Sequence, residues 1–440
     1  MSVIGKRWAQ RHSPGLLDHV LRQSALAGSA QLMGVVLRLA LAVLAARLLG
    51  PFALGLYVLA LTLANGATVL ATVGLDRGAL RFVAHYRGRG ERAEALGIFV
   101  FSSAVCGGVG AGAAILLFFG AHDLAGWAHR PELASVARVI AIAVPFAALG
   151  QISRDGLRGF EDVRLPVVLE QLATPVATAM VLVIVHLARP GDTRAAVIAV
   201  AVAQGALGLV SWVALAVRVG RGRLTPVFQP SEWLRFSVPL WAERGMLFLI
   251  AATGPLLVAR FRGTDSVAVY GVALRVAGLV GLPLAAVSTI FGPTISNLAA
   301  RQDWARLQAM YAELTWTLAL VGGAIGAVLA AAGPLALRAF GPRFAGGYAA
   351  LIVLIASQIV NSATGPSGLV LVMTGRTGWR LANATAGVVL TLALSAVLVP
   401  KWGGLGAAVA VAIASSLLNV AQIYQVRHLV GLWAYARDRG

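Results

Sequence analysis

The sequence carries little charge and almost no lysine. Only 12% of its 440 residues are charged, against about a quarter in soluble globular domains, and 59% are hydrophobic. Its two lysines, Lys6 and Lys401, are followed by Arg7 and Trp402. A P-loop needs a lysine followed by Ser or Thr to hold phosphates, so the chain carries no Walker-type ATPase motif.

The motifs of hydrolytic enzymes are also missing. The sequence contains no HExxH zinc motif and no G-x-S-x-G nucleophile elbow. The single cysteine, Cys106, excludes an intrachain disulfide. The loops between apolar runs are too short to hold an extramembrane active site. We therefore expect a protein that is not an enzyme and that uses no cofactor.

What the sequence has in abundance is long apolar runs. Each run is about 20 residues or more, which is enough to cross a hydrocarbon layer of about 30 Å. The bilayer interior satisfies no backbone hydrogen bonds, so these runs must be helices. We predict twelve transmembrane helices, with cores near 25–48, 52–75, 95–119, 135–157, 167–187, 195–217, 236–258, 267–291, 311–332, 347–372, 381–399 and 405–426.

The net charge of +19 indicates orientation rather than nucleic-acid binding. The cations are dispersed over many short loops, so we expect no nucleic acid as a partner. With the N-terminus inside, the cytoplasmic segments carry more than twice as many Lys and Arg as the outer loops. This asymmetry predicts that both termini are cytoplasmic. We expect the basic segments to contact anionic membrane lipids.

The two halves of the chain repeat each other. A shift of 213 residues aligns positions 21–64 with 234–277 without a gap and gives 12 identities, among them Gly50 with Gly263 and Tyr57 with Tyr270. Further on, Arg164-Leu165 matches Arg380-Leu381. Copies of equal orientation predict two parallel six-helix repeats, a common design for transporters. The predicted divisions are a cytoplasmic arm 1–24, an N-lobe 25–219, a linker 220–234, a C-lobe 235–427 and a cytoplasmic tail 428–440.

A few charged residues fall inside the predicted helices. Arg38 lies in helix 1, Glu243 and Arg244 in helix 7, and Arg275 in helix 8. An arginine at mid-membrane costs at least about 2.5–3.5 kcal/mol, so such residues normally face a polar cavity. Gln31 is seven residues from Arg38 and shares its helix face. We expect Arg38, Arg244, Arg275 and Gln31 to bind substrate.

Glu243 has two interpretations from the sequence. A buried carboxylate can have its pKa raised and couple a proton or cation to transport. The alternative is charge compensation for a cavity arginine. An ion pair with Arg244 is awkward, because adjacent residues on a helix diverge.

Polar stripes mark three further helices. Helix 2 carries Asn65, which we assign to substrate binding, on one face with Thr68, Thr72 and Asp76. The stripes of helix 10 (Ser357, Gln358, Asn361, Thr364) and helix 12 (Ser415, Asn419, Gln422) favour interhelical hydrogen bonding. Asp155 and Glu170, near helix ends, predict ion pairs with Arg154 and Arg164.

Several segments resemble bacterial polysaccharide flippases. They are Arg47-Leu-Leu-Gly50-Pro51 through Tyr57, Val73-Gly74-Leu75-Asp76, Thr374-Gly375-Arg376 and Val399-Pro400-Lys401-Trp402-Gly403-Gly404-Leu405-Gly406-Ala407-Ala408. The resemblance covers about residues 20–430. It is to the polysaccharide, or O-antigen, flippases of the multidrug/oligosaccharidyl-lipid/polysaccharide exporter superfamily.

The resemblance implies a fold and a substrate. The implied fold is an all-α integral membrane protein with two six-helix lobes in a V. The implied function is translocation of a polyprenyl-pyrophosphate-linked glycan across the bacterial inner membrane by proton- or sodium-coupled alternating access. We expect a monomer, with polymerase and export proteins of a polysaccharide pathway as partners. A cationic cavity suits an anionic diphosphate.

Two other classes stay open. A cation-coupled small-molecule or multidrug exporter of the same superfamily is the main alternative, and we expect its transport to depend on Glu243. A membrane scaffold without transport is the third. The intramembrane arginines disfavour the scaffold, because it would gain nothing from their insertion cost.

Overall fold

The computed structural model describes residues 14–160, 164–219 and 225–435. The start of the predicted cytoplasmic arm (1–13), part of the predicted linker (220–224) and the end of the predicted tail (436–440) lie outside the described residues. All regular structure in the described part is helical. Eleven stretches of it are long and apolar enough to cross a membrane, so the chain is a multi-pass membrane protein.

The first of these stretches contains two of the predicted helices. Helix α2 runs from Pro14 to Thr72 but is broken at Gly50, which has non-helical dihedrals (φ 72°, ψ 174°). Pro51 follows and starts the second segment at a position where its missing N–H is tolerated. The prediction of twelve helices is therefore confirmed for the described residues.

The break at Gly50 recurs at its partner in the sequence repeat. Gly263 separates α10 (Pro230–Arg262) from α11 (Thr264–Gly278) and has nearly the same dihedrals, φ 92° and ψ 174°. This region of positive φ with extended ψ is accessible to little besides glycine. The identity at these two positions therefore preserves the same backbone turn in both halves.

Alanine at either position is expected to destabilise the protein. A Cβ costs about 1–3 kcal/mol in this region of the dihedral map, so Gly50→Ala and Gly263→Ala should each lower the free energy of unfolding by that amount. Thermal unfolding in detergent measures the loss, with Gly245→Ala as the control, because a Cβ there meets nothing within 4 Å. Equal stability of all three variants would contradict the shared turn.

The chain divides into two compact units. Unit 1 takes in the described chain up to Leu44, then Leu70–Leu116 and Val139–Leu240. Its helices besides the first part of α2 are α3 (Leu75–Arg89), α4 (Arg92–Phe119), α6 (Glu132–Gly159), α7 (Arg164–Val167), the π-helical turn η1 (Val168–Ala173), α8 (Thr174–Ala188) and α9 (Thr193–Val219).

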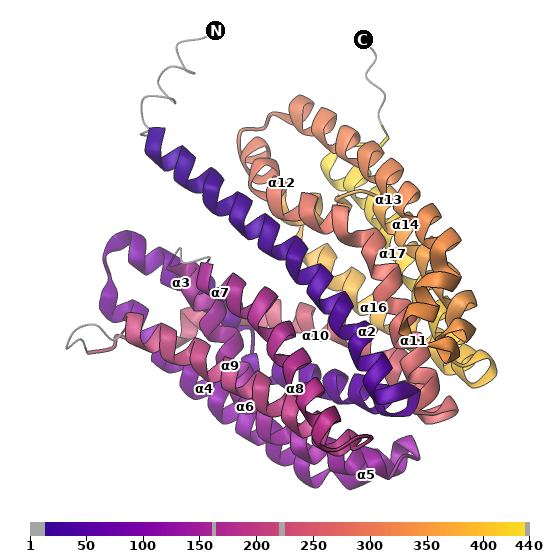
Figure 1. The fold of residues 1–440 in the computed structure, drawn as a ribbon. Coiled ribbons are helices and arrows are strands. Elements are labelled where there is room, and N and C mark those ends of the chain that lie inside the picture. Colours follow the sequence, from indigo (N-terminus) through magenta and orange to yellow (C-terminus); the bar gives the residue numbers. More distant parts are fainter. Residues whose placement is uncertain (1–13, 161–163, 220–224, 436–440) are drawn as a thin grey trace. The chain divides into compact units, whose positions relative to one another are not determined.

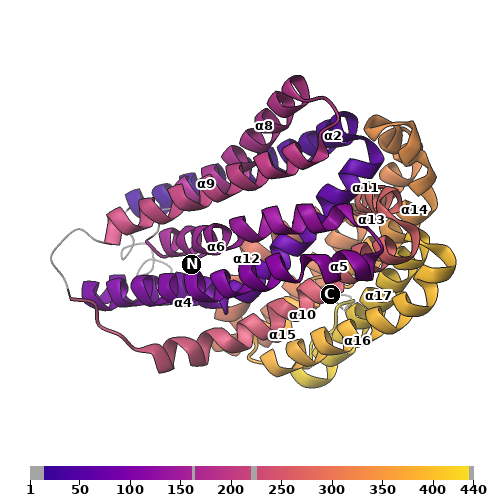
Figure 2. The ribbon, with the colours of Figure 1, turned by 90° about the horizontal axis from the view of Figure 1, so that it is seen from below.

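Small residues let the helices of unit 1 pack closely. Figure 2 shows α4 beside α6 and α8 beside α9. A Cβ on Gly110 of α4 would lie 3.1 Å from the Cα of Pro145 in α6. Glycines at such contacts allow the close approach typical of membrane helices. At one end of the unit, Trp233 and Tyr86 are buried together, and the Trp233 indole donates to the Tyr86 hydroxyl at 2.9 Å.

Unit 2 takes in Ala45–Val69, Leu117–Arg138 and the chain from Trp241 on. Its further elements are α5 (Ala121–Ala128), η2 (Leu279–Gly281), α12 (Leu282–Ala300), α13 (Trp304–Phe340), η3 (Pro342–Gly347), α14 (Tyr348–Ala363), α15 (Ser367–Met373), α16 (Thr377–Trp402) and α17 (Gly404–Val430). Figure 1 shows α13, α14 and α17 side by side. The predicted lobes, 25–219 and 235–427, are defined by the repeat and stay a prediction.

Two of the predicted helix cores contain a break in the structure. The predicted core 267–291 is interrupted by the turn η2, after which Pro283 opens α12. The predicted core 347–372 ends early, because α14 stops at Ala363 and α15 begins at Ser367. Gly365 between them has a φ of 62°, and Pro366 follows. Positive φ and proline end a helix, although hydropathy continues across the break.

Candidate functional site

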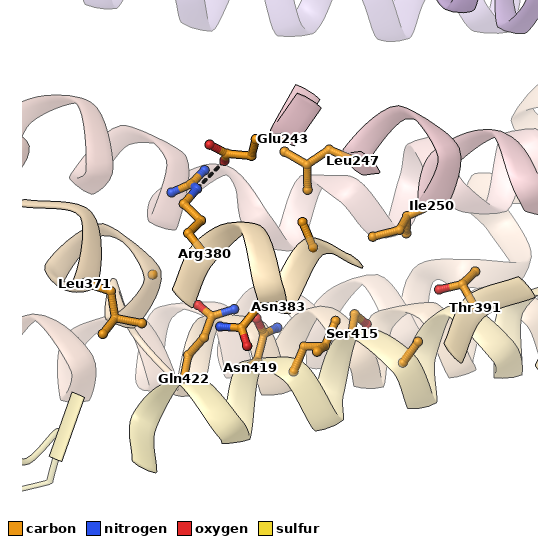
Figure 3. A pocket seen from close by; sticks show the side chains of 14 residues that line it. Glu243, Leu247, Ile250, Leu371, Arg380, Asn383, Thr391, Ser415, Asn419 and Gln422 are labelled. Carbon is orange, nitrogen blue, oxygen red and sulfur yellow. Dashed lines mark hydrogen bonds and ion pairs between the residues drawn. The ribbon is translucent and has the colours of Figure 1, made fainter. Parts of the chain in front are cut away.

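Unit 2 contains a polar pocket among its membrane-spanning helices. The pocket has a volume of about 290 Å³ and is lined by residues of four helices, α10, α15, α16 and α17. The lining residues are Glu243, Leu247, Ile250, Gly368, Leu371, Arg380, Asn383, Ala384, Thr391, Ala414, Ser415, Leu418, Asn419 and Gln422. Figure 3 shows the amides of Asn383, Asn419 and Gln422 close together, with Thr391 farther along the pocket.

An ion pair between α10 and α16 lies at the pocket. Arg380 donates from Nε to Oε1 of Glu243, as the dashed line in Figure 3 marks. Of the fourteen lining residues, these two alone are charged. The partner of Glu243 is thus an arginine 137 positions away, which is in line with the interpretation of charge compensation for a cavity arginine. The ion pair joins two helices and leaves both side chains accessible from the pocket.

Hydrogen-bonded side chains support the wall behind the pocket. Asn383 and Gln425 exchange two amide hydrogen bonds of 2.8 and 2.9 Å between α16 and α17. Asn419 donates to Asn361 at 3.0 Å, and Ser415 bonds Ser357 at 2.8 Å, which ties α17 to α14. These bonds confirm that the polar stripes of predicted helices 10 and 12 act in interhelical contact. Ser415 and Asn419 also line the pocket, so they hold the wall and face the cavity.

Glycine at position 368 makes room for one of the pocket amides. A Cβ at Gly368 in α15 would lie 2.6 Å from Oε1 of Gln422 in α17. Any larger residue would push the Gln422 side chain away from its present place. The short helix α15 therefore needs glycine where it meets this amide.

Of the predicted site residues, Glu243 alone lines this pocket. Arg244 follows it on α10, is half-buried, and is not among the lining residues. Asn65 is exposed on the second segment of α2. The structure therefore brings Glu243 together with Arg380, Asn383 and Gln422 rather than with the other predicted residues of unit 2.

Arg275 is half-buried within unit 2. Its Nη1 is inaccessible to solvent and makes no hydrogen bond to any described residue. Tyr57 lies near enough to interact with it electrostatically, and a Cβ at Gly271, one turn earlier on α11, would lie 3.5 Å from that nitrogen. A buried, unsatisfied guanidinium nitrogen is costly and calls for a functional explanation.

Arg38 belongs to unit 1 and contacts an irregular helix. Its Nη1 donates to Oε1 of Gln171 in the π-helical turn η1. A Cβ at Gly34, one turn before Arg38, would lie 2.8 Å from the Cβ of Gln171, so the two helices meet closely here. Pro175, which lacks an N–H, follows the turn. Gln31 is exposed on α2. π-helical turns often occur at functional sites.

A second ionic cluster in unit 1 involves Arg158. It pairs with both Asp155 and Glu170, and Asp155 also accepts from Gln151 at 3.3 Å. The sequence predicted Arg154 and Arg164 as the partners of these two acids. Arg154 instead donates to Gln151 at 3.1 Å. Arg158 lies three residues after Asp155 on the same helix face, so helix geometry explains why Asp155 pairs with Arg158.

The described residues gather no metal site, and unit 1 holds an apolar cavity. They contain no group of three or more His, Cys, Asp or Glu side chains that could bind a metal ion. Unit 1 has an apolar cavity of about 500 Å³ between α6 and α9, lined only by apolar residues such as Phe146 and Leu209. The polar pocket of unit 2 is thus the candidate site for a polar ligand.

Arg380 is a pocket residue that the sequence did not lead us to predict. Arg380 directly precedes the predicted helix core 381–399, where a cation is typical of a loop. The available signal was the repeat, which matches Arg380-Leu381 with Arg164-Leu165. An arginine that is present in both copies of the repeat can have a role beyond setting the orientation of the helices in the membrane.

Solved structures share this fold. The chain matches an inward-facing multidrug resistance MATE family transporter of the MOP superfamily with a TM-score of 0.79 at 16% identity, over 90% of this chain and 94% of that one. It matches the lipid II flippase MurJ, in an inward closed conformation, with a TM-score of 0.73 at 13% identity, over 92% of this chain and 87% of that one. It also matches a MOP superfamily transporter from Pyrococcus furiosus, described as having a binding pocket of reverse polarity. That match has a TM-score of 0.62 at 15% identity, over 91% of this chain and 94% of that one.

These likenesses define the class as an all-helical membrane protein with the MOP exporter fold, which confirms the predicted fold class. The sequence profile of the family described as "Polysaccharide biosynthesis protein" matches residues 20–299. The chain therefore belongs to this family, as its motifs indicated. A search of curated proteins finds no match.

Proposed function

We propose that this protein is a flippase for a polyprenyl-pyrophosphate-linked oligosaccharide. It moves the glycan from the cytoplasmic to the outer leaflet of the bacterial inner membrane during surface polysaccharide biosynthesis. A proton or sodium gradient drives alternating access of the two repeats. The protein acts as a secondary transporter and not as an enzyme.

The polar pocket of unit 2 carries this proposal. It presents a guanidinium, a carboxylate and three amides from helices long enough to span a membrane. Charged and polar side chains within membrane-spanning helices are costly and normally mark a substrate pathway. Amides and hydroxyls can exchange hydrogen bonds with sugar hydroxyls, and membership in a polysaccharide biosynthesis family makes a saccharide the natural ligand.

Arginines are suited to the anionic part of such a substrate. The planar guanidinium binds phosphate oxygens with two parallel hydrogen bonds. Arg275 offers a buried nitrogen without a partner among the described residues. We assign Arg38, Arg244 and Arg275 to the pyrophosphate or to acidic sugars, and Gln31 and Asn65 to the glycan.

The location and partners follow from the same proposal. Both termini face the cytoplasm, where the basic segments contact anionic lipids. The protein acts as a monomer beside the polymerase and export proteins of its pathway.

A second candidate is a cation-coupled exporter of small molecules. Glu243 favours it, because a carboxylate at a membrane-embedded pocket can bind a proton or a cationic drug. The fold is shared with multidrug transporters. Efflux of a cationic dye by reconstituted protein, abolished by Glu243→Gln, would support this candidate over the flippase.

Reconstitution tests the flippase directly. Proteoliposomes containing a fluorescent polyprenyl-pyrophosphate oligosaccharide should show ion-gradient-dependent movement of the lipid between leaflets. The double variant Arg38→Ala/Arg244→Ala should slow this movement by at least about tenfold, since each lost hydrogen bond to a charged group costs about 1.5–3 kcal/mol. Exposed Arg306→Ala is the control. Wild-type rates in a folded double variant would refute the site, and no movement by the wild-type protein would refute the function.

A further inference from the structure

The ion pair at the pocket occupies only one edge of the Arg380 guanidinium. The contact with Glu243 is made through Nε, and no described residue accepts a hydrogen bond from either Nη group. The Arg380 side chain is 41% exposed and that of Glu243 is 20% exposed. The two terminal nitrogens of the fork are therefore available to a ligand in the pocket.

The surroundings of the pair supply no second anion. Glu243 and Arg380 are the only charged residues in the pocket lining, and the remaining lining side chains are amides, hydroxyls or apolar groups. The lining amides come from α16 (Asn383) and α17 (Asn419 and Gln422) (Figure 3). Glu243 is therefore the one group in the lining that competes with an anionic ligand for Arg380.

We propose that Arg380 is an oxyanion receptor and that Glu243 is its built-in competitor. In the unloaded pocket Glu243 holds the guanidinium, and an incoming phosphate or sugar carboxylate displaces it. Asn383, Asn419 and Gln422 then face the attached sugar. This inference rests on the proposed function and adds to it the anion-binding residue of unit 2 and the class of ligand group that it selects.

The contact between the two side chains opposes oxyanion binding. An oxyanion must displace the carboxylate of Glu243 before it can take the guanidinium of Arg380. By linkage, a bound oxyanion weakens the contact between Glu243 and Arg380 by the same factor.

Binding to the purified full-length protein in nanodiscs tests this. Methyl glucuronide is the first probe, because a carboxylic acid with a pKa near 4 is fully charged at pH 8. Glu243→Gln should raise its affinity about 5- to 20-fold at pH 8, because the variant lacks the competing carboxylate. Arg380→Gln should abolish binding in the wild-type and Glu243→Gln backgrounds. The control Glu91→Gln, which neutralises a surface pair with Arg89, should change nothing.

Inorganic pyrophosphate at fixed pH identifies the source of the oxyanion. Tighter binding of pyrophosphate than of methyl glucuronide assigns Arg380 to the lipid diphosphate, and the reverse order assigns it to an acidic sugar. The inference is overturned if Glu243→Gln binds neither probe more tightly, or if the double variant Glu243→Gln/Arg380→Gln binds as well as Glu243→Gln. These binding results are independent of flipping, so failure of the flippase assay leaves them interpretable.

Discussion

Replacing Arg275 with methionine is expected to stabilise the protein while slowing flipping by about 10- to 100-fold. Arg275 is half-buried in unit 2, and its Nη1 is inaccessible to solvent and unsatisfied among the described residues. Replacing buried charged groups by apolar side chains of similar size is often neutral or stabilising by about 1–4 kcal/mol. The loss of flipping follows because a hydrogen bond to a charged group contributes about 1.5–3 kcal/mol, and each 1.4 kcal/mol is a factor of ten.

The opposite signs of the two effects make this prediction specific. Thermal unfolding in detergent measures the first, and flipping of a fluorescent lipid-linked oligosaccharide measures the second. The matched control is Arg306→Met, whose side chain is 81% exposed and pairs with Asp303. It should alter neither quantity, because an exposed pair contributes little. If Arg275→Met instead lowers the unfolding temperature, Arg275 is a structural residue and its assignment to substrate is wrong.

Much of the fold could be predicted because it follows from local properties of the sequence. Long apolar runs predict spanning helices wherever a bilayer must be crossed. The sequence repeat is also a repeat of backbone conformation, since Gly50 and Gly263 adopt the same unusual turn. The break at Gly365-Pro366 was missed, because hydropathy does not change across it and the cause is backbone geometry.

The pocket was less predictable, because its parts are distant in sequence. The polar character of helices 10 and 12 was visible, and their hydrogen bonds confirm it. The pair of Glu243 with Arg380 joins residues of α10 and α16, and no local pattern indicates which cation meets which acid. The nearest cation in the sequence, Arg244, is an awkward partner, because helix geometry turns neighbouring residues apart.

The segment Val399–Ala408, which resembles the flippase family, forms the turn of the α16–α17 hairpin. Gly403 has a φ of 59° and ends α16, while Arg262 donates to the carbonyls of Pro400, at 3.0 Å, and Lys401, at 2.6 Å. Gly406 is buried, and a Cβ there would lie 2.9 Å from the backbone nitrogen of Val399 and closer still to the Leu398 carbonyl. The segment thus fixes the turn between two of the helices that line the pocket.

Gly406→Ala is therefore expected to lower the free energy of unfolding by about 3 kcal/mol, at the upper end of what one added methyl group costs in a packed interior. The obstacle is backbone, which cannot rotate aside as a side chain can. The control is Gly378→Ala on the same helix hairpin, where a Cβ meets nothing within 4 Å and the helix gains about 0.5–1 kcal/mol. Thermal unfolding should move in opposite directions for the two variants. Because α16 and α17 carry most of the pocket lining, Gly406→Ala should also weaken oxyanion binding. A Gly406→Ala variant that is as stable as the wild type and binds an oxyanion equally well would contradict this prediction.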